Sequence, residues 1–280
     1  MKAIVLFLIL CGVFAGCNND QLPEFTKIDK LRIIALEVNN PEVNPGDTVT
    51  VTPWVSDINE TAALTDTVSV CVDPGLAYGA NPSCDASPTK VDIRINQALT
   101  ITGANSTGSA NTFNVTIPVD LIIFAGRTDQ EKYNGVSYLI HYKLKNSTGT
   151  EISAIRRIVV SEPSKTPKNT NPVISTILAD GAPIAALPIA GAKVQLSTDL
   201  GLGSTETFQS KNVDGSLVVE SELVAVTWMF TDGEAKKFRT EAGSVNEFTG
   251  PSTAPVGRSA HIFAVARDNR AGVKVIKVQF

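Results

Sequence analysis

The sequence is poor in the residues from which catalytic and metal centres are built. It has only two histidines, His141 and His261, with four cysteines and two tryptophans, and aromatic residues make up 6% of its 280 positions. The two histidines lie far apart, and no Gly-x-Ser-x-Gly motif is present, so the sequence offers little material for a nucleophile with a base and an orienting acid. We therefore expect a non-enzymatic protein without a cofactor.

Basic clusters and long apolar segments are also scarce. The formal net charge is −4 and the basic residues are scattered, whereas nucleic-acid-binding proteins carry a clustered basic surface. The one prominent apolar run, Ala3 to Phe14, is shorter than the roughly 20 residues that a membrane-spanning helix needs. We expect neither a nucleic-acid partner nor a spanning helix.

The N-terminus has the parts of a secretory signal. Met1-Lys2 precedes the apolar run, and Ala15-Gly16 leads directly into Cys17, which gives a basic start, an apolar core and small residues before a processing point. This arrangement resembles the bacterial lipoprotein signal, with Phe14 in place of the usual Leu. The resemblance implies a signal peptide over residues 1–16, an acylated (palmitate-bearing) Cys17 as the mature N-terminus, and a lipidated tether over residues 17–29. It also implies attachment to the bacterial cell envelope, with the outer membrane as the first expectation.

The cysteine count indicates one disulfide. Cys11 lies in the signal and Cys17 is the lipid site, which leaves Cys71 and Cys84 as an even pair. Disulfides persist in exported proteins, so we expect these two to be joined, with two free buried thiols as the alternative. Neither histidine is near this pair in sequence, so a zinc site is not expected.

Period-two alternation of apolar and polar residues dominates the chain. Such alternation is typical of antiparallel strands with one buried face, and turn residues such as those at 44–47 and 146–149 interrupt it at short intervals. No stretch shows a sustained helical period. The segments that alternate are Thr48–Val55, Val91–Asn96, Phe113–Val119 and Val136–Leu144. The sequence predicts an all-β protein built as sandwiches.

A proline-containing polar stretch divides the chain into two β-sandwich domains. Residues 161–172 include Pro163, Pro167 and Pro172 and no large apolar side chain, which is typical of an extended linker. We place domain 1 at residues 30–162, the linker at 163–169 and domain 2 at 170–280. We expect the linker to lack buried contacts, to be the first site of proteolysis, and to separate halves that fold alone.

The two halves have similar patterns. Each ends in two alternating segments around a Gly-containing turn, at Gly149 in the first half and at Gly272 in the second. Duplicated units of this size resemble tandem immunoglobulin-like domains. The segment Thr227–Gly233, with Trp228 and Asp232, is similar to the Trp-x-Phe…Asp-Gly strand of polycystic-kidney-disease-type modules. The resemblance implies a core position for Trp228.

Acidic and amide side chains supply the remaining candidate sites. Glu220 and Glu222 are about 6.6 Å apart if the segment is extended, near the spacing of an inverting glycosidase pair, but an exposed strand face is the favoured interpretation. Oxygen ligands on loops also suit calcium. We expect no metal, and if calcium binds, the candidate ligands are Asp57 with Asn59 and Glu60, Asp232 with Glu234, and Asp268 with Asn269.

The histidines are not expected to act in catalysis. His141 falls on a strand face with Lys143 and Lys145, which predicts a solvated side chain, and His261 begins a strand. The function indicated is a lipid-anchored envelope or cell-surface module that binds a protein or glycan, mediates adhesion or serves as a scaffold. An accessory carbohydrate-binding protein is the alternative, although a row of aromatic side chains for stacking on sugars is not apparent.

Overall fold

The computed structural model describes residues 26–58, 63–75 and 82–280, and over these ranges the protein is almost entirely β-structure. Cys17, Asn59 and Glu60 fall outside the described residues, so their predicted roles stay predictions. No helix in the described ranges is long and apolar enough to cross a bilayer. The expectation of an all-β fold is confirmed.

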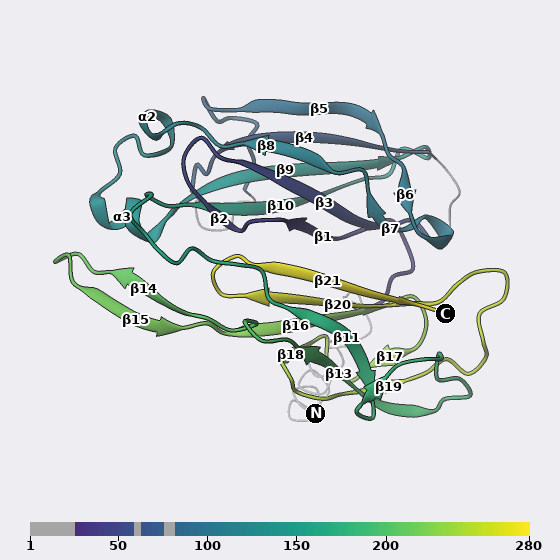
Figure 1. Ribbon diagram of the computed structural model, residues 1–280. Coiled ribbons are helices and arrows are strands. Elements are labelled where there is room, and N and C mark those ends of the chain that lie inside the picture. The colour runs from purple at the N-terminus through teal and green to yellow at the C-terminus, as the bar shows by residue number, and fades with distance from the viewer. Residues whose placement is uncertain (1–25, 59–62, 76–81) are drawn as a thin grey trace, which may run out of the picture.

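The first half forms two facing sheets (Figure 1). One sheet has the order β1-β3-β7-β6, with β8 also paired to β3, and the other has the order β2-β10-β9-β4-β5. The elements are β1 (Arg32–Val38), β2 (Glu42–Val43), β3 (Thr48–Ser56), β4 (Leu64–Val72), β5 (Val91–Ala98), β6 (Ile101–Thr102), η2 (Ala104–Ser106), β7 (Thr107–Ala110), β8 (Phe113–Thr116), α2 (Asp120–Ile123), α3 (Asp129–Asn134), β9 (Val136–Asn146) and β10 (Glu151–Val160).

The core of the first half comes from the inward faces of both sheets. In β3 every second residue, Val49, Val51 and Val55 among them, is fully buried, and in β9 Tyr138 and Tyr142 are buried with them. In β9 Leu139 and His141 on the other face are buried as well, whereas in β3 the predicted alternation is confirmed. It follows from the pleat, which sends successive side chains to opposite faces.

The second half repeats the two-sheet plan with shorter strands. Its sheets have the orders β12-β11-β13-β19-β17 and β18-β16-β20-β21, and β14 and β15 form a separate hairpin. The elements are β11 (Ile174–Ala179), β12 (Ala182–Pro183), β13 (Lys193–Leu200), β14 (Thr207–Lys211), β15 (Leu217–Ser221), β16 (Val224–Phe230), β17 (Glu234–Ala235), β18 (Arg239–Glu241), β19 (Asn246–Thr249), β20 (His261–Asp268) and β21 (Val273–Gln279). Trp228 and Phe230 of β16 and Phe248 of β19 lie fully buried between these sheets.

The two halves lie one above the other, and β1 of the first half lies next to β21 of the second half (Figure 1). Phe263 and Val265 on the outer face of β20 pack against Ile34 and Ala35 of β1, in a third apolar cluster that belongs to neither sandwich alone. Trp54 of β3 meets the Phe263 ring edge-on at 6.4 Å between centroids. Burial of these apolar groups stabilises the junction itself.

A bulge in β1 supplies the first half's side of this junction. The register of β1 against β3 shifts between Ile33 and Ala35. Consecutive side chains alternate in a regular strand, but a bulge re-aims them. Here Ile34 and Ala35 both belong to the junction cluster, while Leu36 packs into the core of the first half.

Two expectations about the strands are wrong. The segment Val91–Asn96 is a strand, but β5 is at the edge of its sheet with an irregular register against β4. Val91 and Ile95 are exposed, while Ile93 packs against the core of the first half. The alternation at 113–119 also ends early, because β8 stops at Thr116 and an exposed Val119 precedes the short helix α2.

The linker is not the contact-free segment that its composition predicts. Lys165 is only 6% exposed, and its ammonium lies 2.7 Å from a Glu42 carboxylate oxygen. The backbone N–H of Asn169 donates to the other oxygen of Glu42 at 2.9 Å. Composition could not reveal this burial, because the partner Glu42 lies more than a hundred residues away in sequence.

The disulfide prediction is confirmed. Cys71 of β4 and Cys84 are joined, with their Cα atoms 5.7 Å apart and a sequence separation of 13. Both are fully buried against Leu139. The bond attaches the segment before β5 to the neighbouring strand β4.

Candidate functional site

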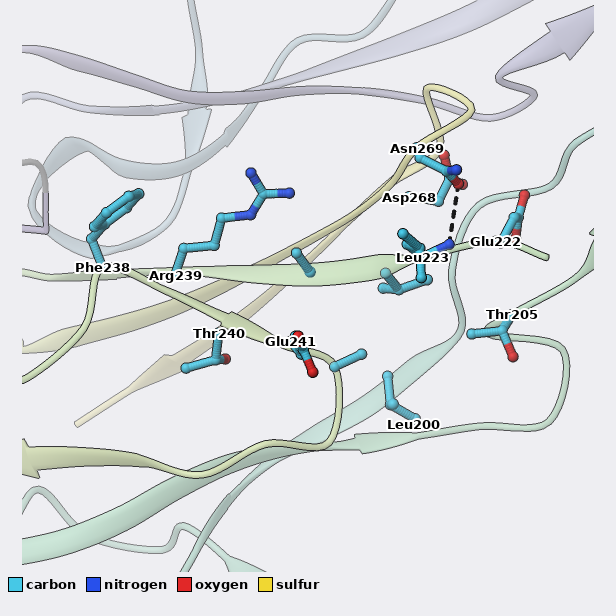
Figure 2. A pocket seen from close by; sticks show the side chains of 13 residues that line it. Leu200, Thr205, Glu222, Leu223, Phe238, Arg239, Thr240, Glu241, Asp268 and Asn269 are labelled. Carbon is cyan, nitrogen blue, oxygen red and sulfur yellow. Dashed lines mark hydrogen bonds between the residues drawn. The ribbon is translucent and has the colours of Figure 1, made fainter. Parts of the chain in front are cut away.

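A groove opens in the second half beside the short edge strand β18 (Figure 2). Its volume is about 660 Å³. β18 has only three residues and pairs with Ala225–Thr227 of β16, and just beyond its end the Ala242 N–H donates to the Val224 carbonyl at 2.9 Å. We call this space the β18 groove. Its apolar lining comes from Leu200, Leu223, Val224, Ala225, Phe238 and Ala242.

Two large apolar side chains at the groove are exposed. Leu223 is 73% and Phe238 is 60% accessible to solvent. Their backbones are nevertheless fixed, because the N–H of Leu223 donates to Oδ1 of Asn269 at 3.1 Å (Figure 2) and the carbonyl of Phe238 accepts from the Trp228 N–H at 2.9 Å. An ordered backbone that presents exposed apolar side chains is typical of interaction surfaces.

The buried core holds the groove wall in place. The Trp228 indole N–H donates to the hydroxyl of Thr240 at 3.0 Å, both being buried. Thr240 is the middle residue of β18, so this bond ties the edge strand to the core of the second half. The neighbouring residues Arg239 and Glu241 are exposed at the groove.

A buried carboxylate forms the inner end of the groove. Burial and the nearby charge of Asp268 raise the pKa of Glu222 to about 7. Its side chain accepts from the Glu206 N–H at 3.0 Å and lies 3.1 Å from the Arg270 guanidinium. Glu222 therefore changes its charge near neutral pH at the point where the groove meets the junction between the halves.

Arg270 connects the groove to a buried ionic network at the junction. Its guanidinium lies 2.8 Å from Glu42 of the first half, 3.1 Å from Glu222 and 3.4 Å from Glu206. The Phe208 ring covers it at 4.4 Å. Burial alone would raise the pKa of Glu42, but hydrogen bonds from Lys165 and Ser161 hold this pKa below its ordinary value. We call Arg270 with these three glutamates the Arg270 network.

The predicted glutamate pair does not form one strand face. Glu220 is exposed on β15 and accepts from the Ser210 hydroxyl, whereas Glu222 lies beyond the end of β15 and is buried. The prediction of an exposed repelling pair is wrong for Glu222, because the ion pair with Arg270 and the hydrogen bond from the Glu206 N–H hold its carboxylate in a buried position.

His141 is buried, which contradicts the prediction that it is solvated. Burial and the charge of Lys143 lower its pKa. Its Nδ1 lies 3.5 Å from the Ser83 hydroxyl, and the segment around Cys84 covers its strand face. His261 begins β20 as predicted and is fully buried, and burial and Lys277 lower its pKa to about 4. Neither histidine lines the β18 groove.

The calcium candidates that the structure describes are not brought together. Asp232 accepts two hydrogen bonds from the Arg258 guanidinium, a bidentate pair at 2.6 and 2.8 Å. Asp268 accepts the backbone N–H groups of Arg270 and Gly272 in the β20–β21 turn. Asp57 is buried at the end of β3. Within residues 26–58, 63–75 and 82–280, no three His, Cys, Asp or Glu side chains form a possible metal site.

Comparison with known proteins gives matches among solved structures only. No family model matches the chain, and no curated protein is detectably similar. The Ig1-2 module of the Drosophila receptor tyrosine phosphatase DLAR is 13% identical, with 89% of this chain and 97% of that chain covered and a TM-score of 0.25. The tandem V-type regions of VCBP3, a chitin-binding protein, are 11% identical, with 89% and 99% covered and a TM-score of 0.29.

A third match is PorU from Porphyromonas gingivalis, 14% identical with a TM-score of 0.25, in which 90% of this chain spans 24% of that chain. The matched structures thus include immunoglobulin-like domains. At these TM-scores the matches carry no argument about activity, ligand or partner. The all-β assignment rests on the strands and sheets themselves.

Sequence reasoning missed the residues that define the groove. Leu223 and Phe238 interrupt polar stretches, Glu220–Glu222 and Lys236–Lys237, without continuing any alternation. A large apolar residue isolated among charges was the available signal. It could not be distinguished from the scattered surface apolar residues that are normal in proteins.

Proposed function

We propose that the protein is a non-enzymatic binding module, held on the cell envelope by an acylated Cys17, which captures an extended polypeptide segment of a partner in the β18 groove. The observation that carries this proposal is that two exposed apolar side chains, Leu223 and Phe238, lie in a groove beside an ordered, short edge strand. An extended peptide can add to such an edge through backbone hydrogen bonds while its side chains occupy the apolar lining.

The first described residues lie beside one end of β16. The Phe230 N–H donates to the carbonyl of Thr26, and the Ile28 N–H donates to the carbonyl of Phe230, so the described chain begins at the C-terminal end of β16. The groove includes Val224 at the other end of that strand, about 20 Å away at 3.3 Å per residue. Phe238 of the same lining lies opposite Trp228, near the first end, so the groove extends along most of β16.

The charges of the groove indicate the kind of segment that fits. Glu241 and Asp268 are acidic, Glu222 is partly ionised near neutral pH, and Arg239 is the basic residue of the lining. Acidic and apolar groups together favour a segment that carries apolar side chains next to lysine or arginine. The single aromatic side chain in the lining, Phe238, is a poor platform for a glycan.

Site-specific photo-crosslinking tests the groove. A photoreactive amino acid replaces Leu223 in the full protein expressed in its own envelope, and we expect a protease-sensitive adduct. The charge-introducing substitution Phe238→Lys should abolish this adduct, because it places a cation in the apolar part of the groove. Leu121→Lys, at an 89% exposed position on α2 of the first half, should leave it unchanged.

Two outcomes would contradict the proposed function. An adduct of equal yield in the Phe238→Lys protein would show that contact does not depend on the groove. An adduct removed by glycosidases but resistant to proteases would identify a glycan instead of a polypeptide.

The lipid anchor is tested separately. Cys17→Ser should release the protein from the membrane fraction or block signal processing, because acyl chains contribute about 0.8 kcal/mol per buried CH₂ to membrane attachment. Mass spectrometry of the N-terminal peptide checks for the acyl chains. A Cys17→Ser protein that stays in the membrane fraction with an unchanged mass would contradict the anchor.

A further inference from the structure

A second pair of arginines lies at the junction of the two halves, away from the Arg270 network. Arg156 of β10 and Arg267 of β20 line the same small crevice, whose volume is about 190 Å³. The other walls are apolar and come from β1, from Ala154 and Ile155 of β10, and from Val273 of β21. We call this space the Arg156–Arg267 crevice.

These two guanidinium groups have no carboxylate partner among the described residues. Neither Arg156 nor Arg267 forms an ion pair within 4.0 Å in the described ranges. Five other arginines do pair with carboxylates, namely Arg94, Arg127, Arg157, Arg258 and Arg270. Arg156 donates through Nη2 to the carbonyl of Ala271, and its buried Nε has no hydrogen-bond partner. Arg267 donates to the Thr227 hydroxyl at 3.3 Å. Most of their N–H groups are left without a protein acceptor.

The carboxylates nearest to the crevice already accept hydrogen bonds from other groups. Glu37 accepts from the Lys274 ammonium at 2.9 Å and from the Val275 N–H at 3.2 Å. Asp268 accepts from the N–H groups of Arg270 and Gly272 within the turn. Neither can turn toward the crevice without leaving buried donors unsatisfied, which is costly.

Both arginines are partly buried. Burial and the neighbouring charge of Arg267 lower the pKa of Arg156 to about 10, and burial lowers that of Arg267. Two like charges in a shared, partly apolar space repel each other, and buried charges in proteins are normally paired. The fold therefore leaves a positive potential at a position where an anion would compensate both groups.

We propose that the Arg156–Arg267 crevice binds a small oxyanion of the phosphate or sulfate type, which bridges the two halves of the protein. Guanidinium groups present a planar fork of N–H donors that matches the oxygens of phosphate. A volume of 190 Å³ corresponds to about six water molecules at roughly 30 Å³ each. It admits such an ion with a few waters but is below the several hundred Å³ of sites for larger ligands.

Titration calorimetry and thermal unfolding of the full mature protein in detergent test this site with inorganic phosphate and with sulfate, at an ionic strength held constant with chloride. We expect saturable binding of one anion per chain and a melting temperature that rises with its concentration. Arg156→Gln and, independently, Arg267→Gln should each weaken binding by at least about tenfold, because each removes charge-assisted hydrogen bonds. Arg127→Gln, the same change on the surface near α3, should leave binding unaltered.

Glycerol phosphate distinguishes the source of the anion. Binding as tight as that of inorganic phosphate would assign the crevice to a phosphoryl group on a larger molecule, and binding of inorganic phosphate alone would assign it to the free ion. Two results would overturn the proposal: the wild-type protein responds to phosphate and sulfate no more than to chloride, or the anion binds equally well to both crevice variants.

Discussion

The two arginine sites lie at the same junction between the halves but differ in the charged groups that surround each guanidinium. Arg270 is surrounded by three glutamates and covered by an aromatic ring, whereas Arg156 and Arg267 share a crevice with no carboxylate partner in the described ranges. Removing one partner of a buried, paired charge is strongly destabilising, but removing a buried unpaired charge is not. The first site is therefore structural, and the second is the one for which we propose an anion.

The largest expected effect is that of Arg270→Met. It leaves Glu206 and Glu222 without their cation and removes one of the two cations at Glu42, so we expect the free energy of unfolding at pH 8 to fall by about 3–5 kcal/mol. Urea unfolding followed by circular dichroism measures it. Arg156→Met in buffer free of phosphate and sulfate should change stability by less than about 1 kcal/mol or raise it. Equal losses in the two variants would remove the distinction between the sites.

A second prediction concerns the pH dependence of the Arg270 network. The pKa of Glu222 is raised from 4.5 in the unfolded chain to about 7, so the folded protein binds the extra proton between these values. Stability is then highest at low pH within this window and falls as pH rises through it. We expect Glu222→Gln to be more stable relative to wild type at pH 8 than at pH 4, by about 2–3 kcal/mol.

The matched control for this experiment is Glu220→Gln. Glu220 is two residues away but exposed on β15, so its substitution should leave the pH profile unchanged. Comparing each variant with wild type cancels other titrating groups. One of these is His261, whose pKa of about 4 makes stability fall as pH drops below its ordinary value of 6.5. Identical profiles for Glu222→Gln and wild type would contradict the assignment.

A small loss is expected at a further ion pair, that of Arg258. It holds Asp232 by two hydrogen bonds, but its side chain is 33% exposed. Partly exposed ion pairs contribute little, so Arg258→Gln should lower the free energy of unfolding by about 1 kcal/mol or less. Because salt screens such pairs, the difference from wild type should shrink in about 1 M NaCl. A loss as large as that of Arg270→Met would show that burial does not separate these sites.

Local patterns in the sequence determined much of the secondary structure. The alternation of apolar and polar residues in Thr48–Val55 and Val136–Leu144 predicted β3 and β9, because successive side chains of a strand point to opposite faces. The two C-terminal hairpins were predicted for the same reason, and the paired cysteines predicted the disulfide. The six-residue helix α3 was missed, although Thr128 and Glu131 form its capping box, because so short a helix has no sustained apolar period.

Tertiary structure alone decided where the two halves meet and which polar side chains are buried. Three features depend on partners distant in sequence. They are the bulge that turns Ile34 and Ala35 outward, the burial of Lys165 by Glu42, and the burial of Glu222 but not of Glu220. Alternation reports only that one face of a strand is apolar. Whether the other face meets water, another sheet or an unpaired guanidinium depends on the packing of layers, because desolvation is a property of the assembled fold and not of a residue type.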